Sequence, residues 1–232
     1  MITNLYTLID DIQIINLDER TDRFDRISSH LNCLGLNNRY NRFSAITRNI
    51  PELTSQENGR LGCFLSHCSV IERAHQNKQK YVLVMEDDCE FISDNVKYYD
   101  FIKLTYTISK LNFDIVYLGA TYYHLEATEF SFLDKVKSYG CTAAFCLIIN
   151  IESMFPKLIN LYKDEDYITD LAISNKGNYS KTTIDGVYNS LDLIRYATNP
   201  ILATQYSSFS NIEQTEVSYP LEDMWKVAKS KI

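Results

Sequence analysis

Three consecutive carboxylates follow a short apolar stretch in the first half of the chain. Residues 82–85 read Val-Leu-Val-Met, and Glu86, Asp87 and Asp88 come directly after them. This pattern predicts a core strand that delivers the acids to its carboxyl end, where open α/β sheets bind their ligands. Because side chains alternate along an extended chain, we expect Glu86 and Asp88 on one side and Asp87 on the other.

These acids predict a divalent metal site. Adjacent carboxylates repel one another, so near a core they need a cation or hydrogen-bond donors. Hard oxygen ligands suit Mn²⁺ or Mg²⁺, which complete their coordination shell with substrate phosphates and water. We predict Asp88 as a direct metal ligand and Glu86 as its neighbour in the site. Two alternatives stay open: a solvated acidic turn that caps the next helix, or the metal site of a phosphatase, kinase or nuclease.

A second group of polar residues follows the first predicted strand, which ends at Leu17. Asn16, Arg20 and Arg23 lie where a nucleotide-binding sheet places its ligand. Arginine binds phosphate through two hydrogen bonds or stacks on a base, and two arginines three residues apart can share a helix face. The alternative is an exposed helix start in which Asp22 and Asp25 pair with these arginines.

Four segments of the chain, taken in order, resemble glycosyltransferase family 25. They are residues 15–23 (Ile-Asn-Leu-Asp-Glu-Arg-Thr-Asp-Arg), residues 62–67 (Gly-Cys-Phe-Leu-Ser-His), residues 86–88, and a weaker set made of 142–144, 184–185 and 199–210. This family includes bacterial lipooligosaccharide galactosyltransferases and collagen galactosyltransferase-like domains. The resemblance runs from about residue 12 to about residue 212 and implies a GT-A-type, Rossmann-like fold, inverting chemistry, a UDP-sugar donor and a divalent metal.

The resemblance also assigns roles to individual residues. Asp185 becomes the candidate general base for an inverting transfer, although an aspartate in this position is also a common helix N-cap. Asp88 is counted as catalytic through the metal that it is expected to bind. His67 is expected to donate to the diphosphate, to orient a carboxylate, or to be a core histidine. The remaining assignments are donor binding by Asn16, Leu17, Arg20, Arg23, Ser66, His67 and Asp87, metal binding by Glu86, Asp88 and Gln205, and an aromatic acceptor side at Tyr122, Tyr123 and His124.

Two positions depart from the family pattern. Arg60 stands where the family often has Glu, and Asn211 stands where it commonly has Asp. A sugar-nucleotide-binding protein that has lost turnover is therefore a second hypothesis. A Mg²⁺-dependent phosphoryl-transfer enzyme is a third, but the chain lacks the Gly-x-x-x-x-Gly-Lys-Ser/Thr loop that would hold phosphate.

The elements that must position these residues alternate between strands and helices. This order predicts an α/β fold with a mostly parallel sheet flanked by helices, in one domain over residues 1–232. Within it, residues of about 10–120 would bind the nucleotide sugar and about 120–215 the acceptor. Strands are expected at 11–17, 40–46, 81–85, 114–118 and 141–149, helices at 21–34, 61–76 and 96–111, and loops at 49–59 and 119–139.

Composition limits the partners. With a net charge of −7, the chain has no general attraction for nucleic acid. It shows no signal peptide and no apolar run near the ~20 residues of a membrane helix, so we expect a cytoplasmic protein, free or attached to a membrane by its surface. None of the six cysteines forms a Cys-x-x-Cys pair, so their spacing suggests buried thiols and not a zinc site. The expected partners are a UDP-sugar and a glycan, glycolipid or glycoprotein acceptor.

Overall fold

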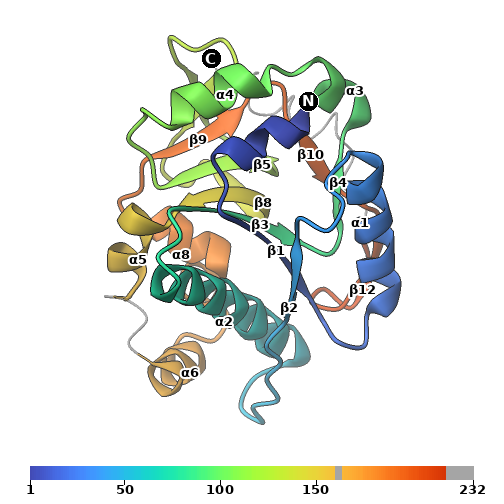
Figure 1. Ribbon diagram of the computed structural model, residues 1–232. Coiled ribbons are helices and arrows are strands. Elements are labelled where there is room, and N and C mark those ends of the chain that lie inside the picture. The colour runs from blue at the N-terminus through green and yellow to red at the C-terminus, as the bar shows by residue number, and fades with distance from the viewer. Residues whose placement is uncertain (160–163, 218–232) are drawn as a thin grey trace.

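An eight-stranded sheet runs through the molecule, with helices on both faces (Figure 1). The computed structural model describes residues 1–159 and 164–217. Six strands of the sheet run in one direction, and β8 and β7 run against them. The predicted α/β fold with a mostly parallel sheet is therefore confirmed. The order across the sheet is β2 (Asn41–Ser44), β1 (Asp11–Asn16), β3 (Tyr81–Glu86), β8 (Cys141–Asn150), β5 (Ile115–Tyr122), β9 (Arg195–Thr198), β7 (Leu133–Val136) and β6 (Leu125–Ala127).

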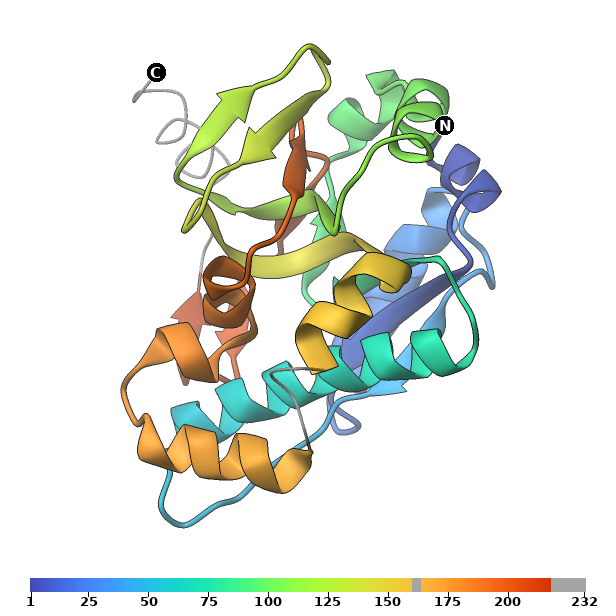
Figure 2. The same ribbon diagram turned by 90° about the vertical axis from the view of Figure 1, so that its left-hand side faces the viewer.

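The helices form two layers, each with its own apolar core. One layer consists of η1 (Ile2–Thr7), α1 (Thr21–Cys33), α3 (Ser93–Tyr98) and α4 (Phe101–Ile108). The other consists of α2 (Ser55–Gln76), α5 (Ile151–Ile159), α6 (Glu165–Ser174), α7 (Tyr179–Thr182) and α8 (Ile184–Ser190). Figure 2 shows α2, in blue-green, lying along the sheet with α5 and α6 beside it.

Strand β3 explains why the site forms at the edge of this core. Val82 and Val84 face the core beneath α2, and Leu83 and Met85 face the core on the α1 side. All four are buried, as expected for a central strand whose two faces are both covered. Glu86 is the last residue of β3, and its side chain is 25% exposed. The strand thus ends where the protein interior meets solvent.

Several predicted boundaries were wrong. Helix α2 begins at Ser55, because Thr54 and Glu57 form a capping box, so part of the predicted loop 49–59 is helical. The predicted helix 96–111 is two helices, since Tyr99 is extended and Asp100 caps the second one. The predicted loop 119–139 contains β6 and β7.

The C-terminal part of the described chain returns to the carboxylates. Strand β10 (Ala203–Gln205) pairs with the short β4 (Cys89–Phe91), so that Gln205 lies opposite Cys89. A hairpin of β11 (Ser208–Ser210) and β12 (Thr215–Val217) follows. From the sequence alone, the last thirty residues could wrap back over the sheet. Residues 203–217 pair with β4 and form this hairpin, and the rest of that stretch lies outside the described residues.

No helix among the described residues is long and apolar enough to cross a membrane.

Candidate active site

A cavity of about 870 Å³ opens beside the carboxyl ends of β1 and β3. Its walls also come from the loop after β2, helix α2, the end of β5, the start of β8, the start of α8, and the segment that follows β10. The residues that line it include Asn16, Leu17, Arg23, Cys63, Glu86, Asp87, Asp88, Tyr123, Ala143, Ala144, Asp185, Gln205, Ser208 and Asn211. Most of the residues selected from the sequence therefore meet in one place.

Asp88 lies close to Gln205. The Gln205 side-chain amide donates to Oδ1 of Asp88 at 3.3 Å, and the backbone N–H of Tyr206 donates to the Asp88 carbonyl at 2.7 Å. The Asp88 side chain is 16% exposed. Burial, followed by the charges of Glu86 and Asp87, raises the pKa of Asp88 to about 7. This carboxylate therefore lacks sufficient compensation from the protein alone.

Asp87 and Glu86 approach different helices, since Asp87 binds Arg23 of α1 and Glu86 lies beside His67 of α2. The expected grouping of Asp88 with Glu86 is not supported, because β3 ends at Glu86, residues 87–88 form a turn, and Nη1 of Arg23 contacts both aspartates.

Asp87 binds neighbouring side chains. Its Oδ2 accepts from Asn16 at 2.7 Å, and its Oδ1 accepts from Arg23 at 2.7 Å. Its backbone carbonyl accepts from Arg26 at 2.8 Å. Asp87 thus ties the end of β3 to the end of β1 and to α1, with both carboxylate oxygens already bonded.

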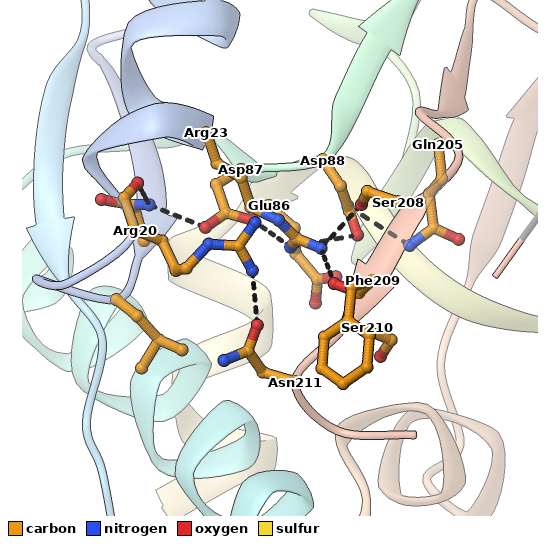
Figure 3. Close-up of polar contacts among 12 residues, drawn as sticks. Arg20, Arg23, Glu86, Asp87, Asp88, Gln205, Ser208, Phe209, Ser210 and Asn211 are labelled. Atoms are coloured by element: carbon orange, nitrogen blue, oxygen red, sulfur yellow. Dashed lines mark hydrogen bonds and ion pairs between the residues drawn. The ribbon is translucent and has the colours of Figure 1, made fainter. Parts of the chain in front are cut away.

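The two arginines that follow β1 have different surroundings (Figure 3). Arg23 lies in the cavity wall, 11% exposed, and donates to Ser208 Oγ and to the Phe209 carbonyl at 2.8 Å each. Arg20 forms two 2.9 Å hydrogen bonds with Asp22 and reaches Asn211 Oδ1 at 2.5 Å. The alternative pairing with Asp22 is therefore present for Arg20, whereas Arg23 pairs with Asp87.

The two departures from the family pattern are both used structurally. Arg60, in α2, forms a 2.9 Å ion pair with Glu213. Asn211 accepts the hydrogen bond from Arg20 described above. Together with the Arg23 contacts, these bonds hold the segment 208–213 against α1 and α2, which makes it a wall of the cavity.

The Gly-Cys-x-x-Ser-His segment anchors α2 to the loop after β2. A Cβ at Gly62 would lie 2.3 Å from the carbonyl oxygen of Ile46, so only glycine allows this approach. The buried hydroxyl of Ser66 donates to the Gly62 carbonyl at 2.7 Å and accepts from the N–H of Ile46 at 2.8 Å. Because both contacts are internal, the predicted donor contact of Ser66 is not supported by its position.

His67 and Cys63 lie one turn apart on α2 and both approach Glu86. Nε2 of His67 is 3.4 Å from Oε1 of Glu86, and Sγ of Cys63 is 3.5 Å from the same oxygen. His67 is buried, and its ring lies nearly perpendicular to the ring of Tyr188. His67 thus lies beside a carboxylate, and two of the expectations for it, core histidine and carboxylate partner, describe its place.

Asp185 lies in the first turn of α8 and faces β8. The helix N-cap is Thr183, whose side chain accepts from the N–H of Gly186, so the N-cap role considered for Asp185 is wrong. Its two oxygens accept from the backbone N–H groups of Ala143 and Ala144 at 2.9 Å each. Burial, then the charge of Glu86, raises the pKa of Asp185 to about 6, although these backbone bonds lower it.

The backbone of β8 is irregular where it meets Asp185. The β5–β8 register shifts on either side of Gly119, and Ala143 has a φ of 53°. A bulge of this kind turns successive N–H groups out of the ladder, where they can bind an anion. Sequence reasoning missed this pair of donors, because nothing in the residue types there marks a bulge.

The predicted acceptor side is only partly at the cavity. Tyr123 is exposed, lines the cavity, and accepts a 3.3 Å hydrogen bond from Thr142. The prediction that Tyr122 lies on the acceptor side was wrong. Alternation along β5 turns its side chain into the core, where it packs in a T-shaped arrangement with Tyr117. His124 is exposed, but it does not line the cavity in the described part of the chain.

Two other arginines support the site and were not assigned a role from the sequence. Arg42 on β2 donates to Oδ1 of Asn16 at 2.7 Å and to the Leu17 carbonyl at 3.0 Å, which fixes the Asn16 amide. Arg26 stacks its guanidinium over the Tyr206 ring at 4.0 Å. Their signal in the sequence is a local cluster of positive residues, with Arg26 close after Arg20 and Arg23 and Arg42 a little further on, but spacing alone could not separate them from Arg20 and Arg23.

Taken together, the fold and cavity define an α/β protein whose central strand delivers acids to a cavity large enough for a small-molecule ligand. The model of glycosyltransferase family 25 (LPS biosynthesis protein) matches residues 9–164. The chain belongs to glycosyltransferase family 25, which confirms the resemblance noted in the sequence.

Similar proteins include a "Glycosyltransferase 25 family member" from Anopheles gambiae, 32% identical over 100 residues. The match covers 34% of this chain and 17% of the relative, so the chain spans less than a fifth of that protein.

Among solved structures, a glycosyltransferase involved in glycosylation of the major capsid of PBCV-1 is 13% identical, with a TM-score of 0.44 over 92% of this chain and 98% of that one. A Drosophila β1,4-galactosyltransferase 7 in complex with manganese, UDP-Gal and xylobiose is 10% identical, with a TM-score of 0.36 over 95% of this chain and 81% of that one. Both scores indicate only a distant similarity of shape.

Proposed function

We propose that this protein transfers a hexose, galactose or glucose, from a UDP-sugar to a hydroxyl group of a glycan, glycolipid or glycoprotein, with inversion at the anomeric carbon. The observation that carries the proposal is the meeting of Asp88, Arg23 and Asp185 in one cavity of about 870 Å³. These three residues supply a metal-binding carboxylate, a cation for phosphate and a second acid for proton transfer. Membership of family 25 supports the class of reaction.

The residues present fit a hard divalent cation, Mn²⁺ or Mg²⁺. Oε1 of Gln205 is buried and has no hydrogen-bond partner among the described residues, and the Asp88 carboxylate, 16% exposed, lies beside it. Asp88 and Gln205 would hold the cation, with Glu86 next to them. When bound, the cation would supply the positive charge that stabilises the departing diphosphate.

Asp185 has the surroundings of a general base. The N–H groups of Ala143 and Ala144 fix its carboxylate, and a pKa of about 6 leaves it ionised at neutral pH yet basic enough to take a proton. In the proposed step, the acceptor oxygen attacks the anomeric carbon and gives its proton to Asp185. The bond from that carbon to the diphosphate breaks, and UDP leaves with the bonding electrons.

Donor binding is proposed for the other side of the cavity. Asn16, Leu17 and Arg23 line it at the end of β1, where an α/β sheet binds nucleotides. Residues of about 10–120 would then hold the donor and about 120–215 the acceptor. The division is not complete, because Gln205 from the second part approaches Asp88 beside Arg23 from the first part.

A sugar-nucleotide-binding protein without turnover is the second candidate. Arg20 is already bonded to Asn211, and Arg60 to Glu213, so two cations near the cavity are engaged by the protein itself. The test is UDP release from a panel of UDP-sugars, with Mn²⁺ or with EDTA, for the parent and for Asp185→Asn. Transferase activity predicts metal-dependent UDP release in the presence of an acceptor and its loss in Asp185→Asn, with UDP binding kept by both. UDP binding without release by the parent would support the second candidate.

A further inference from the structure

The cavity wall contains a second group of metal-binding side chains, separate from Asp88 and Gln205. Cys63 and His67 are four residues apart on α2, so they lie on one face of the helix, and Glu86 faces them from the end of β3. The three ligand atoms, Sγ, Nε2 and a carboxylate oxygen, lie within 4.8 Å of one another.

Two distances within this group are close to those between ligands of a single metal ion. N–H···O hydrogen bonds are about 2.7–3.2 Å long, and Nε2 of His67 is 3.4 Å from Oε1 of Glu86. In a tetrahedral zinc site the bonds are about 2.0–2.3 Å, so nitrogen and oxygen ligands stand about 3.3 Å apart and sulfur and oxygen about 3.6 Å. The observed distances are 3.4 Å and 3.5 Å. Two of the three distances between ligand atoms therefore already agree with a tetrahedral site.

The third ligand–ligand distance, between Cys63 and His67, and the open coordination position follow from the same geometry. Sγ of Cys63 and Nε2 of His67 are at most 4.8 Å apart. A side-chain rotation that moves one of these atoms by about 1 Å would bring all three ligand atoms within bonding distance of one metal ion. Cys63 and Glu86 line the cavity, which leaves the fourth coordination position facing it.

We propose that Cys63, His67 and Glu86 form a binding site for a zinc-class divalent cation. Thiolate and imidazole ligands select Zn²⁺ or Co²⁺ over Mn²⁺ and Mg²⁺, whereas Asp88 and Gln205 offer only oxygen. The cavity therefore has two cation sites of different chemistry that compete for Glu86. This site does not depend on the proposed transferase activity, because it is defined by metal binding alone.

Co²⁺ is the probe, since a cobalt–thiolate bond gives a charge-transfer absorption band that oxygen ligands do not give. The reduced full-length chain is titrated with Co²⁺, and Zn²⁺ is then added as competitor. We expect one equivalent to produce the band, Zn²⁺ to remove it, and Cys63→Ser to abolish it. Zn²⁺ affinity should fall about a hundredfold or more in that variant, because loss of a ligand costs at least as much as loss of a partner that orients one.

Two matched variants complete the test. Cys33→Ser removes an exposed thiol in α1 and should keep the band. Asp88→Asn alters the proposed Mn²⁺ site and should also keep it. Absence of the band from the parent, its persistence in Cys63→Ser, or its loss in Cys33→Ser would overturn the proposal. Circular dichroism of each variant excludes loss of the fold as the cause, and UDP release, assayed separately with Mn²⁺, reports on the proposed function independently.

Discussion

Replacing Asp88 by asparagine should stabilise the metal-free protein at pH 8. The pKa of Asp88 is raised from its ordinary value of 3.8 to about 7, first by burial and then by Glu86 and Asp87. A carboxyl group whose pKa is raised in the folded state destabilises that state once it is ionised. The cost is absent below pH 3.8, where both states are protonated. It grows as the pH rises to about 7 and is constant above that.

The size of the effect follows from the same values. The difference between 3.8 and about 7 corresponds to about 4 kcal/mol at ~1.36 kcal/mol per pH unit. This figure already includes the attraction of Arg23, 3.7 Å away, which lowers the pKa of Asp88. It is an upper bound, because the Asp88 side chain is 16% exposed and solvent screens part of the cost. The hydrogen bond from Gln205 can remain, since the asparagine side chain keeps an acceptor oxygen.

The assay is urea unfolding in EDTA at pH 5 and pH 8, for the parent and Asp88→Asn. We expect the variant to gain stability at pH 8 and to gain clearly less at pH 5. Asp22→Asn is the control: Asp22 is 65% exposed and its pKa is lowered to about 2 by Arg20, so this variant should show no gain at pH 8. A saturating concentration of Mn²⁺ should then stabilise the parent more than Asp88→Asn, because the cation prefers a folded state that holds its ligand. The reasoning is refuted if Asp88→Asn is less stable than the parent at pH 8, or if its gain in stability is the same at pH 5 and pH 8.

Three further outcomes follow from the site. Transfer should rise with pH through about 6 as Asp185 loses its proton, and an initial-rate profile that is flat from pH 5 to 7.5 would exclude it as the base. Arg23→Ala should weaken UDP binding by about 1.5–3 kcal/mol, the value of a hydrogen bond to a charged group; unchanged affinity by calorimetry, with the fold intact, would remove Arg23 from the donor site. Gly62→Ala should cost about 1–3 kcal/mol in urea unfolding, because its Cβ would meet the Ile46 carbonyl at 2.3 Å. Gly59→Ala, in the same helix, meets only atoms at 3.3 Å or beyond and should be neutral or gain up to about 1 kcal/mol, so equal losses would contradict the packing argument.

The sequence predicted the part of the site that depends on local periodicity. An apolar run ending in three acids was enough to place β3, and alternation was enough to separate Asp87 from Glu86. The arginines after β1 were also placed correctly near the same edge of the sheet. The capping box at Thr54 was equally local, but the helix it begins was predicted to start only at Leu61.

The features that the sequence could not predict depend on contacts between segments far apart in the chain. The direction of β8 cannot be derived from its apolar residues, because a strand buried on both faces looks alike in parallel and antiparallel pairing. The partners of Asp185 are backbone groups in a bulge, which leave no trace in residue type. Cysteine spacing within the chain argued against a zinc site. The third ligand of the zinc site proposed for Cys63 and His67 is Glu86, which lies 19 or more residues further along the chain.

The placement of β8 also constrains how the chain can fold as it is made. β8 pairs with β3 and β5, and the other partner of β5 is β9. A ribosome that has released residues 1–140 has therefore produced β5 with both of its edges unpaired, and such edges readily pair with other chains. The pairing of β3 with β8 spans about 60 residues, and long-range pairing slows folding. We therefore expect the two halves of the sheet to join only after residue 150 has emerged, which makes the nascent chain most dependent on chaperones between β5 and β8.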